Sequence, residues 1–242
     1  MPLFKSIYID ASSQILVWEI TESFEELFGQ VQLNEKSLER LNGMKSQLHQ
    51  RAFLSVRMLL KEAGYSDFDL YYDAFGKPHL NSNNCHTEPA SSERSRSVEV
   101  SISHSHTFST IIISNKKTGI DIELQREKII RIAQKFCDSE FNFLSRSLGK
   151  ENIEEYIKKL TVIWGAKEAI FKIKNVEGIS FKNHIQVHEF EMNDKGTIAT
   201  LELENRKQQF SIFFEEIESS PAITDLQTKQ CFMLVYAFEK QQ

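Results

Sequence analysis

The segment Gly119-Ile120-Asp121-Ile122-Glu123 places two carboxylates two residues apart. On a β-strand, residues two apart point to the same side, so Asp121 and Glu123 would lie next to each other. Such a pair suits Mg²⁺, which typically takes one or two carboxylates together with phosphate and water oxygens. The alternative is the solvent-facing side of an alternating strand.

A second segment, Trp164-Gly165-Ala166-Lys167-Glu168-Ala169-Ile170-Phe171-Lys172, has a helical composition. Glu168 and Lys172 are four residues apart and would share one face of the helix. Glu168 could serve as a further metal ligand or as a general base, and Lys172 could neutralise phosphate charge. The alternative is a surface ion pair that contributes little to stability.

Three weaker patterns could contact phosphate or a nucleotide. They are Ile102-Ser103-His104-Ser105-His106 at a strand end, the turn Gly76-Lys77-Pro78, and Arg51 in an amphipathic helix. Arginine binds phosphate through paired donors, and a histidine beside hydroxyls can donate to it. Each pattern also has an ordinary structural interpretation: loop histidines, a common turn, or an arginine reaching solvent.

The composition limits the classes of protein to which the chain can belong. Its 242 residues are 40% hydrophobic with 9 glycines and 4 prolines, which excludes a disordered or low-complexity chain. The net charge of −5 argues against bulk nucleic-acid binding, although a local basic pocket is compatible with it. The spacing of Cys85, Cys137 and Cys231 indicates neither a disulfide framework nor a zinc site. We expect no membrane span, no signal peptide and a cytoplasmic protein.

The elements that must position these residues follow from the apolar pattern. Strands are predicted over 4–9, 15–20, 68–72, 98–103, 108–114, 119–124, 185–190, 197–203, 210–214 and 231–238. Helices are predicted over 34–63, with a break near 42–43, and over 129–148 and 151–174, and 81–97 is predicted to be an exposed loop. The turn at 115–119 separates an N-terminal half, 1–116, from a C-terminal half, 117–242. Blocks of helices and strands in each half indicate an α+β fold.

Taken in order, these segments resemble the motif series of the 4′-phosphopantetheinyl transferases. The similarity is to the longer, single-chain type named after the surfactin-synthetase-activating enzyme. The specific part is the pair GIDIE and WxxKExxxK, with Asp121 and Glu168 47 residues apart. The matching motifs run from Arg51 to Lys172, and the remaining C-terminal part is similar only in being rich in strands.

The resemblance implies a fold and a reaction. Two similar α+β halves would pack as a pseudo-dimer and bind coenzyme A between them, so that a monomer is complete. The enzyme would transfer 4′-phosphopantetheine from coenzyme A to a serine of an apo acyl or peptidyl carrier protein, releasing 3′,5′-ADP with Mg²⁺ as cofactor. Nucleic acid and membrane would not be partners.

The resemblance also implies roles for individual residues. Asp121, Glu123 and Glu168 would hold Mg²⁺, Glu168 would also act as base toward the carrier serine, and Lys172 would stabilise the diphosphate and the leaving group. The residues expected to bind coenzyme A are Arg51, Phe75, Gly76, Lys77, Pro78, Ser103, His104, Lys167 and Lys172. A carrier surface would combine basic and apolar side chains: Lys116, Lys117, Arg126, Lys128, Arg131, Ile130 and Phe136.

The sequence departs from the family in two places and leaves other functions open. The 81–97 segment is longer and more polar than usual, and neither Lys36 nor Lys45 can be assigned to the lysines that often precede the Arg51 position. The alternatives are a homologue that binds coenzyme A or a carrier protein without catalysis, a solvated basic stretch in place of the carrier surface, and another Mg²⁺-dependent phosphotransferase. The absence of a GxxxxGK[ST] loop argues against the last.

Overall fold

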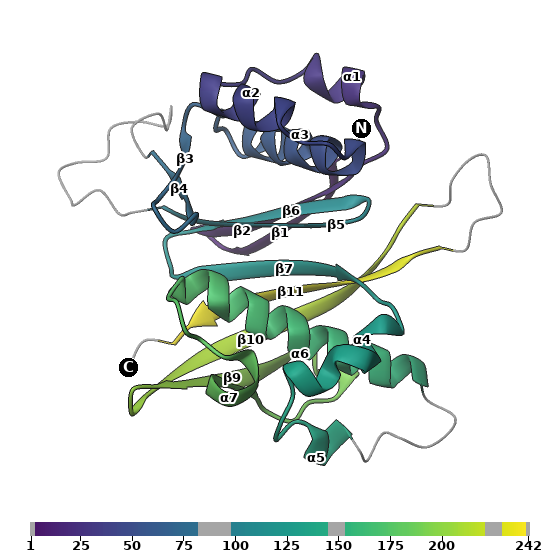
Figure 1. The fold of residues 1–242 in the computed structure, drawn as a ribbon, viewed down its shortest axis with the longest axis vertical. Coiled ribbons are helices and arrows are strands. Elements are labelled where there is room, and N and C mark those ends of the chain that lie inside the picture. Colours follow the sequence, from purple (N-terminus) through teal and green to yellow (C-terminus); the bar gives the residue numbers. More distant parts are fainter. Residues whose placement is uncertain (1–2, 82–97, 145–152, 221–228, 241–242) are drawn as a thin grey trace. The chain divides into compact units, whose positions relative to one another are not determined.

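The computed structural model describes residues 3–81, 98–144, 153–220 and 229–240. The chain divides into two compact units, Met1–Lys117 and Thr118–Gln242. The loop predicted at 81–97 lies outside the described residues from position 82 onward. Each unit combines an antiparallel sheet with helices, which confirms the predicted α+β class (Figure 1).

The N-terminal unit is built on a six-stranded antiparallel sheet in the order β1-β2-β6-β5-β4-β3. The strands are β1 (Leu3–Asp10), β2 (Ser13–Glu19), β3 (Leu70–Tyr72), β4 (Pro78–Leu80), β5 (Glu99–Ser105) and β6 (Phe108–Ser114). β6 is buried along its whole length, as expected for a strand in the interior of a sheet, and its buried residues include Ser109, Thr110 and Ser114.

The helices of this unit are α1 (Phe24–Phe28), α2 (Glu35–Asn42) and α3 (Gln47–Glu62), which confirms the predicted break near 42–43. Helix α3 is terminated by Gly64, two residues after its last helical residue, and the φ of +83° at Gly64 is a conformation that glycine adopts without strain. The backbone N–H of Gly64 bonds to Lys61 O, and that of Tyr65 bonds to Leu60 O. This is the Schellman pattern, and it satisfies the last carbonyls of the helix.

A buried ion pair fixes α2 against α3. Arg57 Nε lies 2.8 Å from Asp67 Oδ1, and the two side chains are 3% and 1% exposed. Asp67 also accepts hydrogen bonds from Ser37 Oγ and from the backbone N–H of Asn34, the residue that caps α2. The charge of Asp67 is therefore compensated in the interior.

The C-terminal unit contains a five-stranded antiparallel sheet in the order β7-β11-β10-β9-β8. The strands are β7 (Thr118–Leu124), β8 (Ile185–Val187), β9 (Gly196–Leu203), β10 (Arg206–Glu218) and β11 (Cys231–Glu239). The long helix α6 (Ile153–Lys174) lies along one face of this sheet against β7 and β11 (Figure 1). The shorter helices are α4 (Lys128–Ile132), η2 (Ala133–Lys135), α5 (Phe141–Leu144), α7 (Phe181–His184) and η4 (Met192–Asp194).

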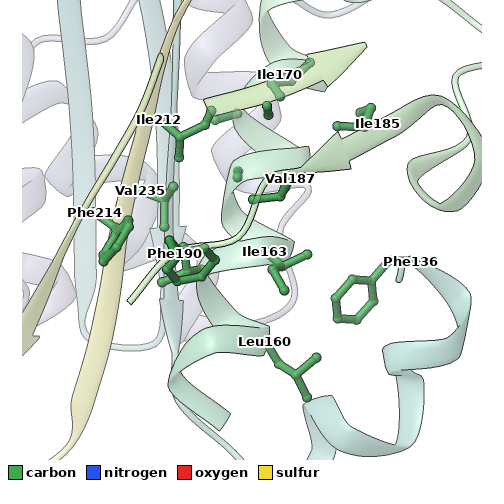
Figure 2. Close-up of a cluster of buried hydrophobic side chains, with 14 of the residues drawn as sticks. Phe136, Leu160, Ile163, Ile170, Ile185, Val187, Phe190, Ile212, Phe214 and Val235 are labelled. Carbon is green, nitrogen blue, oxygen red and sulfur yellow. The ribbon is translucent and has the colours of Figure 1, made fainter. Parts of the chain in front are cut away.

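The core between α6 and the sheet is apolar and fully buried. Leu160, Ile163 and Ile170 of α6 belong to one buried cluster with Ile212 and Val235 of the sheet, and Phe136 closes the cluster on the side to which Leu160 and Ile163 point (Figure 2). The aromatic rings of Phe143 and Phe214 pack against Phe190, at 5.9 and 5.1 Å between ring centroids. This packing holds α6 at a defined position over β7.

Two predictions from the sequence were wrong in this unit. The single helix predicted over 129–148 is interrupted, because the chain turns between Phe136 and Phe141; residues 145–148 lie outside the described part. Phe136, expected to be an exposed apolar contact for a carrier protein, is 1% exposed and belongs to the core.

No helix among the described residues is long and apolar enough to cross a membrane.

Candidate metal and phosphate site

The two carboxylates of the first motif lie on β7, on the side opposite to Ile120 and Ile122. Ile120 and Ile122 are completely buried. The Asp121 side chain is only 6% exposed, whereas Glu123 is half-buried. The interpretation of Asp121 as part of a solvated strand face is therefore wrong, and burial of such a carboxylate requires a positive charge nearby.

Helix α6 lies so close to strands β7 and β11 that two positions accept only glycine without adjustment. A Cβ atom on Gly119 would overlap the carbonyl oxygen of Ala169, and one on Gly165 would lie 2.7 Å from Val235 Cγ2 and 3.6 Å from Asp121 Oδ2. The contact at Gly119, together with the short distance from position 165 to Asp121, places the WxxKExxxK segment of α6 beside the GIDIE strand. The two motifs recognised separately in the sequence therefore lie next to each other in the structure.

Lys172 supplies a positive charge at this site. Its Nζ atom donates to Asp121 Oδ1 at 2.9 Å and to the carbonyl oxygen of Ile120 at 2.8 Å. The Lys172 side chain is 27% exposed, so one side of the ammonium group remains accessible. The predicted alternative, a surface ion pair between Glu168 and Lys172, is replaced by this contact between two elements.

Glu168 lies on α6 within the electrostatic field of the same carboxylates. The pKa of Glu168 is raised to about 7: desolvation by burial is the largest cause, the negative charges of Asp121 and Glu123 act in the same direction, and Lys172 opposes them. A carboxyl group with such a pKa is well suited to exchange protons near neutrality. Bringing a divalent cation into the cluster would favour its charged form.

The donor set of the cluster fits Mg²⁺, although the cluster is not a closed cage. Within the described ranges, no group of three or more histidine, cysteine, aspartate or glutamate side chains is already arranged to hold a metal ion. Asp121, Glu123 and Glu168 nevertheless offer only hard oxygen donors, and Mg²⁺ usually binds one or two carboxylates and completes its shell with phosphate and water. An open arrangement of this kind suits an ion that arrives with a phosphorylated substrate.

Comparison with known proteins bears on this half of the chain. Residues 117–231 match the family model of the 4′-phosphopantetheinyl transferase superfamily. The C-terminal unit therefore contains a 4′-phosphopantetheinyl transferase superfamily domain. The chain has no match among curated proteins. The matched range includes both motifs, so the ion pair of Lys172 and Asp121 lies inside the superfamily domain.

Lys167, which was expected to bind coenzyme A, lies instead in the interior of the superfamily domain. Its side chain is completely buried, and Nζ contacts Glu140 Oε1 at 2.6 Å and the carbonyl oxygens of Phe136 and Phe181 at 2.6 and 2.9 Å. Burial lowers the pKa of Lys167, and the negative charge of Glu140 opposes that shift. All three ammonium donors are thus directed at protein atoms, which corrects the expectation of a coenzyme contact.

Apart from Lys167 and Lys172, the predicted coenzyme-binding residues lie in the N-terminal unit, ahead of the superfamily domain. Gly76, with a φ of +81°, forms the turn between β3 and β4, where the Asp73 carboxylate accepts hydrogen bonds from the backbone N–H groups of Phe75 and Lys77. Pro78 begins β4, and Lys77 pairs with Glu99 at 3.2 Å. The turn is therefore ordered by its own side chains.

Arg51, Ser103 and His104 come from different elements of the same unit. Arg51 lies in the second turn of α3 and donates through Nη1 to the carbonyl oxygen of Glu22 at 3.2 Å. Ser103 is buried on β5, whereas the neighbouring His104 is exposed and its ring lies 6.2 Å from that of His49. His49 was not among the predicted site residues.

Sequence reasoning also missed Glu140 and Asp73. Glu140 is the buried partner of Lys167, and Asp73 orders the Phe75–Pro78 turn. An aspartate at the start of a turn that contains glycine is a usable signal, so Asp73, three residues before Gly76, could have been found. Glu140 carries no such signal, because its partner is 27 positions away and no spacing rule connects them.

Proposed function

We propose that this protein transfers the 4′-phosphopantetheine group of coenzyme A to a serine hydroxyl of an apo acyl or peptidyl carrier protein, with Mg²⁺ as cofactor and 3′,5′-ADP as the second product. The observation that carries the proposal is the convergence of Asp121 and Glu123 with Glu168 and Lys172 inside a superfamily domain. The site combines hard anionic ligands with a cation, as transfer of a phosphorylated group requires.

In the proposed reaction the serine Oγ forms a bond to the β-phosphorus of coenzyme A. The bond from that phosphorus to the bridging oxygen breaks, and the electron pair leaves with 3′,5′-ADP. Glu168 accepts the serine proton, directly or through a water molecule, and its raised pKa supports this role. Lys172 stabilises negative charge on the diphosphate. When bound, Mg²⁺ would supply further positive charge to the diphosphate oxygens.

We propose that the coenzyme's nucleotide end is bound by residues of the N-terminal unit. Arg51 would meet the 3′-phosphate, Ser103 and His104 other phosphate oxygens, and the Phe75–Pro78 turn the adenine. The chemistry of these groups supports the proposal, because a guanidinium matches phosphate geometry and the Phe75 ring at the turn is exposed, so that it can pack against a base.

We further propose that the carrier protein docks beside Glu123, at the beginning of α4. A cavity of about 210 Å³ opens here and is lined by Glu123, Leu124, Arg126, Lys128, Ile129, Ile132, Thr161 and Trp164. Arg126 and Lys128 are exposed, so the rim is basic and the floor apolar. An acidic, partly apolar helix of a carrier protein is complementary to this surface.

The transfer is tested by intact-protein mass spectrometry of an apo carrier protein incubated with the enzyme, coenzyme A and Mg²⁺. The proposal predicts a mass gain of one phosphopantetheine that is absent without the metal. Glu168→Gln should abolish the gain and retain coenzyme A binding, whereas Glu154→Gln, at an exposed position of the same helix, should behave as wild type. Coenzyme A binding without transfer to any of several carriers would instead support a non-catalytic binding homologue.

Docking is tested with the double substitution Arg126→Glu and Lys128→Glu. Because both residues lie at the rim of the cavity, KM for the carrier should rise at least about tenfold while KM for coenzyme A changes little. Equal increases in both values would contradict a carrier-specific surface.

A further inference from the structure

We propose that Lys167 and Glu140 act together as positioning residues for Glu168. Their buried ion pair sets the rotation of α6 about its axis and thereby the distance of Glu168 from the carboxylates of β7. The inference rests on the proposed function for its kinetic consequences, but its structural core concerns only the C-terminal unit.

The ammonium group of Lys167 uses all three of its N–H donors in contacts with protein atoms. Nζ of Lys167 lies 2.6 Å from Glu140 Oε1, and the two side chains are 0% and 1% exposed. The same nitrogen donates to the carbonyl oxygens of Phe136 and Phe181. An ammonium group has three protons, so these three acceptors define where it can lie.

Glu140 connects this lysine to two further segments of the backbone. Its Oε1 atom also accepts a hydrogen bond from the backbone N–H of Val187 in β8 at 3.0 Å. Its Oε2 atom accepts one from the N–H of Asp138 at 3.0 Å, in the turn before α5. A single carboxylate therefore joins α6 to the edge strand of the sheet and to the interrupted helical segment.

Aromatic packing reinforces the same side of α6. The Trp164 ring lies 5.2 Å from the ring of Phe136 and 5.5 Å from that of Phe181, measured between centroids. These are the two residues whose carbonyl oxygens accept from Lys167. The other side of the helix is held by the close contacts of Gly165 with Val235 and of Ala169 with Gly119.

Glu168 directly follows Lys167, so any rotation of the lysine about the helix axis moves the glutamate by the same angle. A carboxylate about 6 Å from the axis moves by about 2 Å when the helix turns by about 20°. Productive sites tolerate displacements of only about 0.5 Å. A small rotation of α6 would therefore move Glu168 away from the carboxylates of Asp121 and Glu123.

Stability alone does not account for such a pair. Replacing a buried ion pair by uncharged groups of similar volume is often neutral for stability, whereas removing one partner leaves an uncompensated charge. The informative variant is therefore the double substitution Lys167→Met with Glu140→Gln, in which the amide oxygen introduced at position 140 can still accept from the N–H of Val187. Lys159→Met is the matched control, because Lys159 is a 2% exposed lysine of the same helix that pairs with Glu155 and Glu191.

The experiment measures Mn²⁺ affinity by electron paramagnetic resonance and the kinetics of transfer in parallel, with Mn²⁺ itself as the probe. For the double variant we expect a rise in the Mn²⁺ dissociation constant of about tenfold, a fall in kcat of about 10- to 100-fold and KM for coenzyme A within about threefold of wild type. For Lys159→Met we expect wild-type Mn²⁺ affinity and kcat.

The proposal is overturned if the folded double variant keeps wild-type Mn²⁺ affinity and kcat, or if Lys159→Met loses as much. Failure of the double variant to fold would also overturn it, because the pair would then serve folding and not positioning. Wild-type protein that binds Mn²⁺ but transfers nothing would refute the proposed function, and the comparison of Mn²⁺ affinities would still decide the positioning role. Wild-type protein that binds no Mn²⁺ would overturn both.

Discussion

The Nζ atom of Lys172 lies 2.9 Å from Oδ1 of Asp121, although the two residues are 51 positions apart in the sequence. This ion pair joins the two motifs. The lysine belongs to α6 and the aspartate to β7, so the contact records how closely the helix lies over the strand. It also shows how the buried carboxylate is compensated: an ammonium group of the protein lies beside it.

Replacing Lys172 by Met should affect both stability and chemistry. The buried Asp121 would lose the ammonium group of Lys172, and we expect a loss of about 1–3 kcal/mol in the free energy of unfolding without metal. Transfer should slow by about 100-fold or more, because the charge on the diphosphate would be stabilised less well. Lys174→Met is the control, since Lys174 lies two residues after Lys172 on the same helix and pairs with Glu239. Similar transfer rates in the two variants would contradict the role of Lys172.

Replacing Glu168 by Gln should stabilise the metal-free protein above neutral pH. The folded state raises the pKa of Glu168 to about 7, so folding binds its proton more tightly than the unfolded chain does. Stability from this group is complete below the ordinary value of 4.5 and is lost as the pH rises through about 7. We expect the variant to be more stable than wild type by about 1–3 kcal/mol at pH 8 and nearly equal at pH 4.5.

The measurement is denaturant unfolding of both proteins at the two pH values, in the presence of a chelator. Adding Mg²⁺ at pH 8 should raise Tm of the wild type more than that of the variant, because the ion relieves the repulsion that the glutamine has already removed. A stability difference that does not change with pH would show that Glu168 titrates as it does in an unfolded chain.

Replacing Gly119 by Ala should disturb the contact between β7 and α6. The added methyl group would overlap the carbonyl oxygen of Ala169, so the helix has to shift, at a cost of about 1–3 kcal/mol or more. Because both carboxylate motifs border this contact, Mg²⁺ affinity should fall as well. Gly43→Ala is the control, since its nearest neighbours would lie at ordinary distances of 3.5 and 3.6 Å. Thermal unfolding and Mn²⁺ binding measure the two effects.

Replacing Arg57 by Leu should lower the free energy of unfolding of the N-terminal unit by more than a substitution at the surface does. Asp67 would remain buried without its guanidinium partner, which typically costs about 3–5 kcal/mol. Asp67→Asn in the same chain should restore part of this loss. Arg40→Leu is the control, because Arg40 is exposed and lies over the Tyr72 ring at 5.3 Å; we expect a loss below about 1 kcal/mol. Equal losses for Arg57→Leu and Arg40→Leu would contradict this prediction.

The strands were predictable because their apolar patterns are long and regular. The run from Phe108 to Ser114 is continuous and became a fully buried strand, and the alternation in GIDIE became β7. The prediction of a strand from residue 68 was too early, because the Asp69 carboxylate accepts a hydrogen bond from the backbone N–H of Ser66 and forms a turn there. Local hydrogen bonding of this kind competes with strand pairing.

The site was predictable only where its residues lie in short motifs. Asp121 and Glu168 were recognised because each stands in a pattern whose spacing has a physical meaning. The burial of Lys167 was not predictable, because a lysine beside a motif glutamate is equally compatible with a surface position. The interruption after Ala133–Lys135 was missed for a similar reason: the apolar spacing continues, but Glu140 turns inward to meet Lys167.

The glycine contacts between β7 and α6 also limit how this protein could diverge over evolutionary time. A side chain at position 119 would push helix α6 away from β7, and one at position 165 would push it away from Val235 of β11. A substitution at either position therefore shifts Glu168 and Lys172 relative to Asp121. Substitutions are easier to accommodate around Glu123, because this residue is half-buried and its neighbours Leu124 and Arg126 line the cavity. Related sequences should therefore vary around Glu123 and keep both glycines.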